Sequence, residues 1–241
     1  MNFLELFNSG NIVGAHRGAS STAPENTMRA LEMSIGHSDF IEIDVQLSRD
    51  GIAVIFHDDT LERTTNLTVP KRVSELSFKE LSELDYGSWF DGKSEPLLTL
   101  RKALKFIKEN NLFLNIEIKD MHDCFSDEEV VSTVVREIKS FNVESQVIIS
   151  SFRAQYLPLC KEMALDIPTA LLVYKKHPDE LIEYLKELEV DAYNMNDELI
   201  DSDSVQKLKD AGFYVGVYTV NNPSRQKELF EMGVNGIFSD I

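Results

Sequence analysis

Short apolar runs rich in β-branched residues alternate with amphipathic stretches along the chain. The apolar runs predict eight strands, at Ile12–His16, Phe40–Leu47, Phe113–Ile118, Val147–Ser151, Thr169–Val173, Asp191–Asn194, Tyr214–Thr219 and Gly236–Ser239. The amphipathic stretches predict seven helices, at Glu25–Ile35, Leu100–Glu109, Asp127–Phe141, Ala154–Met163, Asp179–Glu187, Asp203–Ala211 and Ser224–Met232. Strands that alternate with helices favour parallel βα units, so the pattern predicts an α/β fold, a (β/α)8 TIM barrel. The apolar stretch Phe3–Phe7 is expected to cover the bottom of the barrel.

One segment breaks this rhythm, because the second predicted strand runs into the turn signal Ser48-Arg49-Asp50-Gly51 and is followed by a second alternating run. Asp-Gly is typical of a two-residue type I′ hairpin. In that register Arg49 faces Ile52, and counting outward places Asp44 opposite His57. The sequence therefore predicts a hairpin extension of the second strand that brings His57 beside Asp44.

Residues 58–99 form a long irregular insertion that contains a short helical pattern and the string YGSWFDG. Long insertions in compact domains are usually functional. We therefore expect residues 1–241 to form a single domain, with 58–99 acting as a lid or substrate wall at the carboxyl-terminal face of the barrel.

Charge and composition limit the possible partners of this chain. The 241 residues carry a formal net charge of -17, which argues against binding to nucleic acid or to anionic membrane surfaces. Basic residues are absent from the start of the chain and no apolar run reaches the ~18 residues of a membrane span, so we expect a cytoplasmic protein. Cys124 and Cys160 are expected to be reduced thiols.

Five residues near the ends of predicted strands carry the candidate chemistry: His16, Glu42, Asp44, His57 and Glu117. Glu42 and Asp44 are two apart on a strand and therefore share a face. Together with Glu117 they offer three oxygen ligands, which suit one divalent hard cation, Mg²⁺ or Ca²⁺. The two histidines have the properties of a general acid and a general base. The other histidines, His37, His122 and His177, are interpreted as surface residues.

Two cations accompany this set. Arg17 follows His16, and Lys119 lies two residues beyond Glu117 on the same face. Both can meet phosphate oxygens, although a salt bridge to Glu117 or Asp44 is the alternative for Lys119. The string PENT at 24–27 opens the first predicted helix, where its amides can hold an anion or its polar side chains can serve as caps.

The order of the strings HRG, PENT, EID, HDDTLERTT, NIEIK, SSF, VYTVN and GVNGIFSD resembles the glycerophosphodiester phosphodiesterases from His16 to Asp240. The resemblance implies a TIM barrel that hydrolyses glycerophosphodiesters to sn-glycerol 3-phosphate and an alcohol, with a divalent metal. It assigns catalysis to His16 and His57, metal binding to Glu42, Asp44 and Glu117, and phosphate binding to Arg17 and Lys119.

Some positions depart from the family pattern. Tyr218 stands where many members have Trp, which keeps an aromatic substrate wall, Asn235 replaces a common Asp, and Arg153 replaces an acidic residue. Two rival functions stay open: cleavage of a lipid phosphodiester, as by a lysophospholipase D, and a non-catalytic barrel that binds phosphate metabolites. The first rival needs an apolar entry, which Tyr86, Trp89 and Phe90 can supply. The preferred alcohol, the choice between Mg²⁺ and Ca²⁺ and the oligomeric state are left open.

Overall fold

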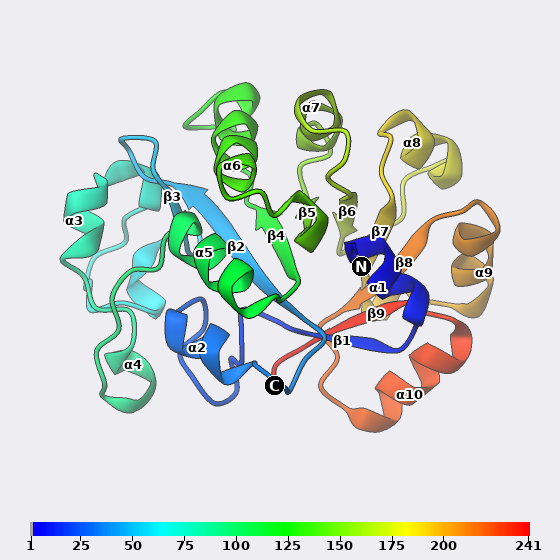
Figure 1. Cartoon of the computed structure of the whole chain (residues 1–241), viewed down its shortest axis with the longest axis horizontal. Coiled ribbons are helices and arrows are strands. Elements are labelled where there is room, and N and C mark those ends of the chain that lie inside the picture. The colour runs from blue at the N-terminus through cyan, green and yellow to red at the C-terminus, as the bar shows by residue number, and fades with distance from the viewer. Residues whose placement is uncertain (1) are drawn as a thin grey trace.

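The computed structural model describes residues 2–241 and contains a closed barrel of parallel strands surrounded by helices (Figure 1). Neighbouring strands follow the order β1-β9-β8-β7-β6-β5-β4-β2, and β1 pairs with β2 to close the ring. The strands are β1 (Ile12–Ala15), β2 (Phe40–Leu47), β3 (Ala53–Ile55), β4 (Leu114–Ile118), β5 (Val147–Ser151), β6 (Thr169–Val173), β7 (Ala192–Asn196), β8 (Tyr214–Tyr218) and β9 (Gly236–Ser239). All eight predicted strands are confirmed, and so is the (β/α)8 barrel.

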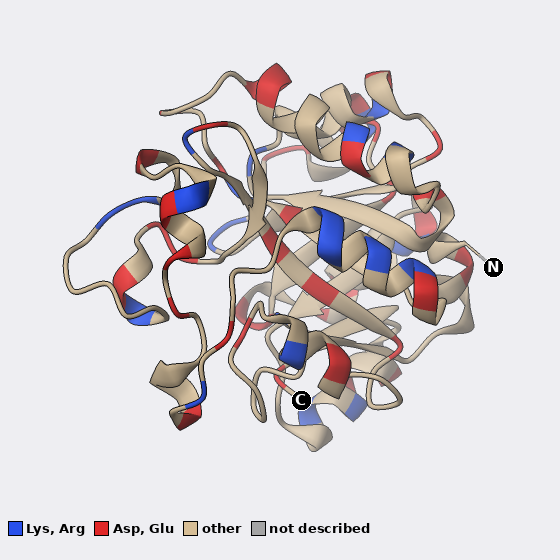
Figure 2. Ribbon diagram, turned by 60° about the vertical axis from the view of Figure 1, so that its left-hand side comes forward, with Lys and Arg blue, Asp and Glu red and all other residues tan. Residues whose placement is uncertain are grey.

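Amphipathic helices cover the outside of the barrel and bury their apolar stripes against the strands. They are α2 (Met28–Met33), α5 (Leu100–Asn110), α6 (Asp127–Phe141), α7 (Tyr156–Met163), α8 (Leu181–Glu187), α9 (Ser202–Asp210) and α10 (Pro223–Met232). Across residues 2–241, no helix is both long and apolar enough to cross a membrane. Acidic positions are spread over the surrounding helices and loops (Figure 2).

The prediction of a helix at Glu25–Ile35 is wrong at its start, because α2 begins only at Met28. Thr27 is the N-cap, and its side chain accepts a hydrogen bond from the backbone N–H of Ala30. Asn26 adopts a left-handed backbone with φ 58°, which a helix interior does not allow. The string PENT is therefore mostly a loop, and it places the side chain of Asn26 within hydrogen-bonding distance of Asp44.

The amino-terminal segment closes the bottom of the barrel, as predicted for Phe3–Phe7. Helix α1 (Phe3–Ser9) buries Phe3 and Phe7 in a cluster with Phe40 and other residues from the strands. The ring centroids of Phe3 and Phe40 lie 5.5 Å apart in an edge-to-face arrangement. Gly14 leaves room for the ring of Phe40, which would lie 2.2 Å from a Cβ atom at that position. This apolar cluster fills the bottom of the barrel, so a polar site in the barrel has to lie at the opposite end.

The hairpin after β2 exists, but its predicted register is wrong by one residue. Strand β3 runs antiparallel to β2, with Val45 opposite Ile55 and Leu47 opposite Ala53. This register places Phe56 opposite Asp44, and the backbone N–H of Phe56 donates to the carbonyl of Asp44 over 2.9 Å. The loop has three residues rather than two, because the N–H of Ser48 bonds to the carbonyl of Ile52. Gly51 at φ 76° fits the glycine of a bulged three-residue turn.

The insertion at residues 58–99 has its own small core. It contains α3 (Phe78–Ser82), α4 (Ser88–Asp91) and the short 3-10 turns Leu61–Arg63 and Val73–Glu75. Its buried side chains pack on the outer part of the hairpin in a cluster of Val54, Phe56, Leu61, Val73, Leu76, Leu81, Tyr86 and Leu97. The insertion is therefore anchored to the β2–β3 side of the barrel (Figure 1).

Candidate active site

Three carboxylates meet where the carboxyl ends of β2 and β4 adjoin. Glu42 and Asp44 alternate along β2 toward the barrel interior, and Asp44 is the register partner of Glu117 on β4. Ligand oxygens from all three lie within 4.8 Å of one another. Glu42 and Asp44 are buried, whereas Glu117 is partly exposed. The predicted ligand set is thus brought together.

The electrostatics of this trio fit a bound cation. Burial, followed by the negative charges of Asp44 and Glu117, raises the pKa of Glu42 well above its usual range. Burial and the charge of Asp44 also raise the pKa of Glu117. Oxygen Oε1 of Glu42 is buried without a hydrogen-bond partner within residues 2–241. Three crowded carboxylates with one unsatisfied buried oxygen match the all-oxygen donor sets of Mg²⁺ and Ca²⁺.

Neighbouring side chains fix the orientation of two of these carboxylates. The backbone N–H of Arg17 donates to Glu42 Oε2 over 2.8 Å. Asn26 Nδ2 donates to Asp44 Oδ2 over 2.8 Å. Burial by itself raises the pKa of Asp44, but the charges of Lys119, His57 and Arg17 outweigh burial and lower that pKa. Asp44 is therefore held as an anion.

The two basic residues predicted to contact phosphate, Arg17 and Lys119, also lie at this site. Lys119 Nζ donates to Glu117 Oε1 over 2.7 Å and lies 3.4 Å from Asp44 Oδ1, as expected from the salt-bridge alternative. Arg17 Nη1 donates to Glu25 Oε1 over 2.8 Å, and its Nε lies 3.6 Å from Asp44 Oδ2. Both positive groups are thus held beside the carboxylate trio.

His16 follows β1 directly and forms a dyad with a carboxylate. Its Nδ1 donates to Asp240 Oδ1 over 2.7 Å, although the two residues are 224 positions apart in sequence. Asn221 Nδ2 and Ser20 Oγ also donate to Asp240. The hydrogen bond from His16 is the main cause that lowers the pKa of Asp240 to about 2. Because Nδ1 is engaged by a carboxylate, Nε2 of His16 is the nitrogen available for proton exchange.

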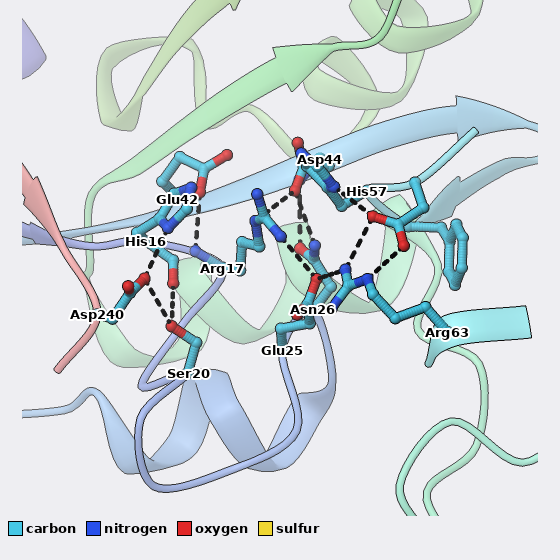
Figure 3. A network of polar contacts seen from close by, with 12 residues as sticks. His16, Arg17, Ser20, Glu25, Asn26, Glu42, Asp44, His57, Arg63 and Asp240 are labelled. Atoms are coloured by element: carbon cyan, nitrogen blue, oxygen red, sulfur yellow. Dashed lines mark hydrogen bonds and ion pairs between the residues drawn. The ribbon is translucent and has the colours of Figure 1, made fainter. Parts of the chain in front are cut away.

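His57 forms a second dyad of the same kind. Its Nδ1 donates to Asp58 Oδ1 over 2.6 Å, and Arg63 from the insertion donates to both Asp58 and Glu25. Gln46 Nε2 donates to the carbonyl oxygens of Phe56 and Asp58, which holds the chain on both sides of His57. In Figure 3, His16 with Asp240 and His57 with Arg63 lie on opposite sides of Arg17. His57 thus reaches the site through the loop after β3 rather than through the strand pairing.

A cavity of about 360 Å³, called here the inner cavity, opens above these groups. Its polar lining includes both catalytic candidates and two carboxylates, and its apolar lining comes mainly from β5, β6, β8 and β9. The lining residues are His16, Arg17, Glu42, His57, Asn115, Glu117, Ser150, Phe152, Leu172, Asn196, Tyr218, Thr219 and Phe238. Phe152 and Tyr218 pack edge to face with centroids 5.9 Å apart, so the predicted aromatic wall includes Tyr218.

Other predicted features fall outside this cavity. Tyr86 is buried in the core of the insertion, and neither it nor Trp89 or Phe90 lines the inner cavity. His37 and His122 are exposed, as predicted. His177 is instead partly buried, and its ring nitrogens contact the hydroxyl of Tyr193 and the carbonyl of Leu199. Cys124 and Cys160 are free thiols.

Arg153 and Asn235, which depart from the family pattern, have structural partners. Arg153 binds Asp127 with two hydrogen bonds of 3.0 Å, at the start of α6. Asn235 Oδ1 accepts from the backbone N–H of Val215 over 2.9 Å. Neither residue lines the inner cavity.

Comparisons with known proteins identify the family to which this chain belongs. The family model described as "Glycerophosphoryl diester phosphodiesterase family" matches residues 16–241. A glycerophosphodiester phosphodiesterase of Caldanaerobacter subterraneus subsp. tengcongensis is 33% identical over 236 residues, which cover 95% of this chain and 93% of the relative. One from Bacillus altitudinis is 31% identical over 235 residues, with 94% and 93% covered. The solved structure of an Oleispira antarctica phosphodiesterase in complex with the product sn-glycerol-3-phosphate superposes with a TM-score of 0.89 at 32% identity, covering 98% of this chain and 95% of that one. The chain is therefore a hydrolase that belongs to the glycerophosphoryl diester phosphodiesterase family.

Proposed function

We propose that this protein hydrolyses glycerophosphodiesters to sn-glycerol 3-phosphate and an alcohol, with one divalent cation and two histidines. The observation that carries the proposal is the convergence of three buried or half-buried carboxylates and two histidine–carboxylate dyads on one cavity. A glycerol 3-phosphate unit fits a cavity of about 360 Å³. The similar Oleispira antarctica phosphodiesterase was solved with that product.

Glu42, Asp44 and Glu117 would hold the cation. When bound, a divalent cation supplies charge neutralisation for a phosphate oxygen and lowers the pKa of the attacking group. Arg17 and Lys119 already lie beside these carboxylates and add positive charge for the phosphate oxygens as negative charge develops there. Arg17 also fixes Glu42 through its backbone N–H.

The histidines would move protons on opposite sides of the phosphate. One imidazole accepts the proton of the attacking hydroxyl or water at Nε2, and the other, which enters protonated, donates its Nε2 proton to the leaving oxygen. Asp240 and Asp58 keep the Nδ1 proton in place and stabilise the protonated rings. The attacking group is either water or a hydroxyl of the glycerol arm, which would give a transient cyclic phosphate.

A second candidate substrate, an acylated lipid phosphodiester, is favoured by one observation. Phe152 and Tyr174 are exposed at 38% and 54% and pack edge to face, with ring centroids 5.7 Å apart. Since Phe152 lines the inner cavity, this pair forms an apolar edge where an acyl group on the glycerol arm could rest. The mouse relative named lysophospholipase D is 24% identical over 268 residues.

An assay on matched substrates distinguishes the two candidate substrates, the unacylated glycerophosphodiester and the acylated lipid phosphodiester. We expect turnover of glycerophosphocholine with release of sn-glycerol 3-phosphate, measured by a coupled dehydrogenase assay. The acylated analogue, lysophosphatidylcholine, should react with a kcat/KM lower by at least about 10-fold, because the acyl chain exceeds the inner cavity. A preference for the acylated substrate would favour the lipid candidate, and the absence of hydrolysis of both would contradict the proposed function.

A further inference from the structure

A second cavity adjoins the first and shares two of its residues. This outer cavity has a volume of about 620 Å³ and is lined by His16, Arg17, Ser20, Ser21, Glu25, Asn221 and Asp240. Only His16 and Arg17 also line the inner cavity. Ser20 and Ser21 lie in the loop after β1, whereas Asn221 and Asp240 follow β8 and β9. Both cavities therefore open at the carboxyl-terminal face of the barrel, with His16 and Arg17 between them.

The two cavities differ in size and lining, and these differences match the two groups esterified to the phosphate of a glycerophosphodiester, the glycerol and the alcohol. The inner cavity contains two of the three carboxylates, Glu42 and Glu117, and at its base Asn115 Nδ2 donates to Ser150 Oγ over 2.8 Å. The barrel interior limits the depth of the inner cavity, which therefore suits the glycerol group that all glycerophosphodiesters share. The outer cavity is larger and is bounded by loops, so it suits the alcohol group, which varies from one substrate to another.

Resting on the proposed function, we propose that the leaving alcohol of the diester occupies the outer cavity, so that its lining selects which alcohols are accepted. The phosphate then lies beside His16 and Arg17, which both cavities share. His16 is in that case the proton donor to the leaving oxygen, and His57, on the other side of Arg17, is the base (Figure 3).

The chemistry of the lining defines the class of alcohol. It consists of hydroxyl, amide and carboxylate groups beside His16 and Arg17 and includes no apolar side chain. The two carboxylates are already compensated, because Glu25 pairs with Arg17 and Arg63, and Asp240 pairs with His16 and Asn221. The hydroxyl of Ser21 makes no hydrogen bond within residues 2–241 and is exposed. Such a lining suits a small polar alcohol, a polyol or an amino alcohol, rather than an acyl chain.

Added bulk at Ser21 tests this assignment, because its side chain faces the outer cavity and takes no part in the catalytic contacts. We compare kcat/KM for the methyl and inositol esters of sn-glycerol 3-phosphate in wild type and Ser21→Trp. The inositol ester should lose at least about 10-fold more than the methyl ester, since only the larger alcohol meets the indole. Ser21→Met, a smaller change, should shift the ratio in the same direction by less.

Thr22→Trp is the matched control, because Thr22 is exposed on the same loop but does not line the outer cavity. It should leave the ratio of the two esters unchanged. An unchanged ratio in folded Ser21→Trp and Ser21→Met would overturn the proposal, and so would an equal shift in Thr22→Trp. If the wild type hydrolyses neither ester, the proposed function itself is overturned, which distinguishes the two failures.

Discussion

Replacing Glu117 or Glu42 with glutamine is expected to lower kcat by about 10²–10³-fold while the fold stays intact. Each substitution replaces one of the three carboxylates that would hold the cation, whose ligand oxygens lie within 4.8 Å of one another, with a neutral amide. Removing one buried like charge also relieves repulsion, so the stability of the cation-free protein should be unchanged or higher. Turnover, circular dichroism and thermal melting measure these effects.

The same variants have a readout that does not depend on turnover. A cation that binds only the folded protein raises the melting temperature, and this rise should be present in wild type and much reduced in Glu117→Gln. Glu109→Gln is the matched control, because Glu109 is exposed on α5 and, within residues 2–241, pairs only with Lys105. Wild-type turnover and an undiminished thermal shift in both site variants would contradict the metal assignment.

The second large effect is expected at the histidines. His16→Ala and His57→Ala should each lower kcat by about 10²–10⁴-fold, the usual contribution of a positioned acid or base. The double variant should lose less than the product of the two effects, because groups that act as a unit are not additive. His37→Ala, which removes an exposed histidine, should retain wild-type kcat.

An activated leaving group separates the two roles. The p-nitrophenyl ester of glycerol 3-phosphate needs little protonation of its leaving oxygen, so the variant without the acid should be partly rescued and the variant without the base should not. The outer-cavity proposal assigns the acid to His16, so we expect rescue in His16→Ala. Small, equal losses in both variants on both substrates would show that neither histidine transfers the proton.

The strands and the convergence of the three carboxylates could be predicted from the sequence because both follow from local patterns. Apolar β-branched runs mark the strands, and in a parallel barrel the polar residues at their carboxyl ends meet at one rim. Glu42 and Asp44 therefore converged with Glu117 as predicted. His16 and His57 reached the same cavity.

The partners of these residues depended on distant parts of the chain, and the sequence pattern did not identify them. Asp240 contacts His16 across 224 positions, and an aspartate at a strand end has many possible uses. Asn26 lies in a motif that also predicts a helix start, but its side chain binds Asp44. Asp58 directly follows His57, and that adjacency was the available signal for the second dyad.

The hairpin shows how a local signal can fail by one residue. Asp50-Gly51 fits both a two-residue turn and a three-residue bulged turn, and the two differ by one step in register. The structure has the three-residue form, so Asp44 faces Phe56. His57 still lies in the inner cavity because Gln46 holds the carbonyls of Phe56 and Asp58.

Cation-dependent hydrolysis is tested by the turnover of glycerophosphocholine in protein stripped of metal with EDTA and then titrated with Mg²⁺ or Ca²⁺. We expect stripping to lower the release of sn-glycerol 3-phosphate to about one hundredth or less, and one cation per chain to restore it. Glu117→Gln, treated in the same way, should not be restored. Full activity in the stripped wild-type protein would contradict a catalytic cation at Glu42, Asp44 and Glu117.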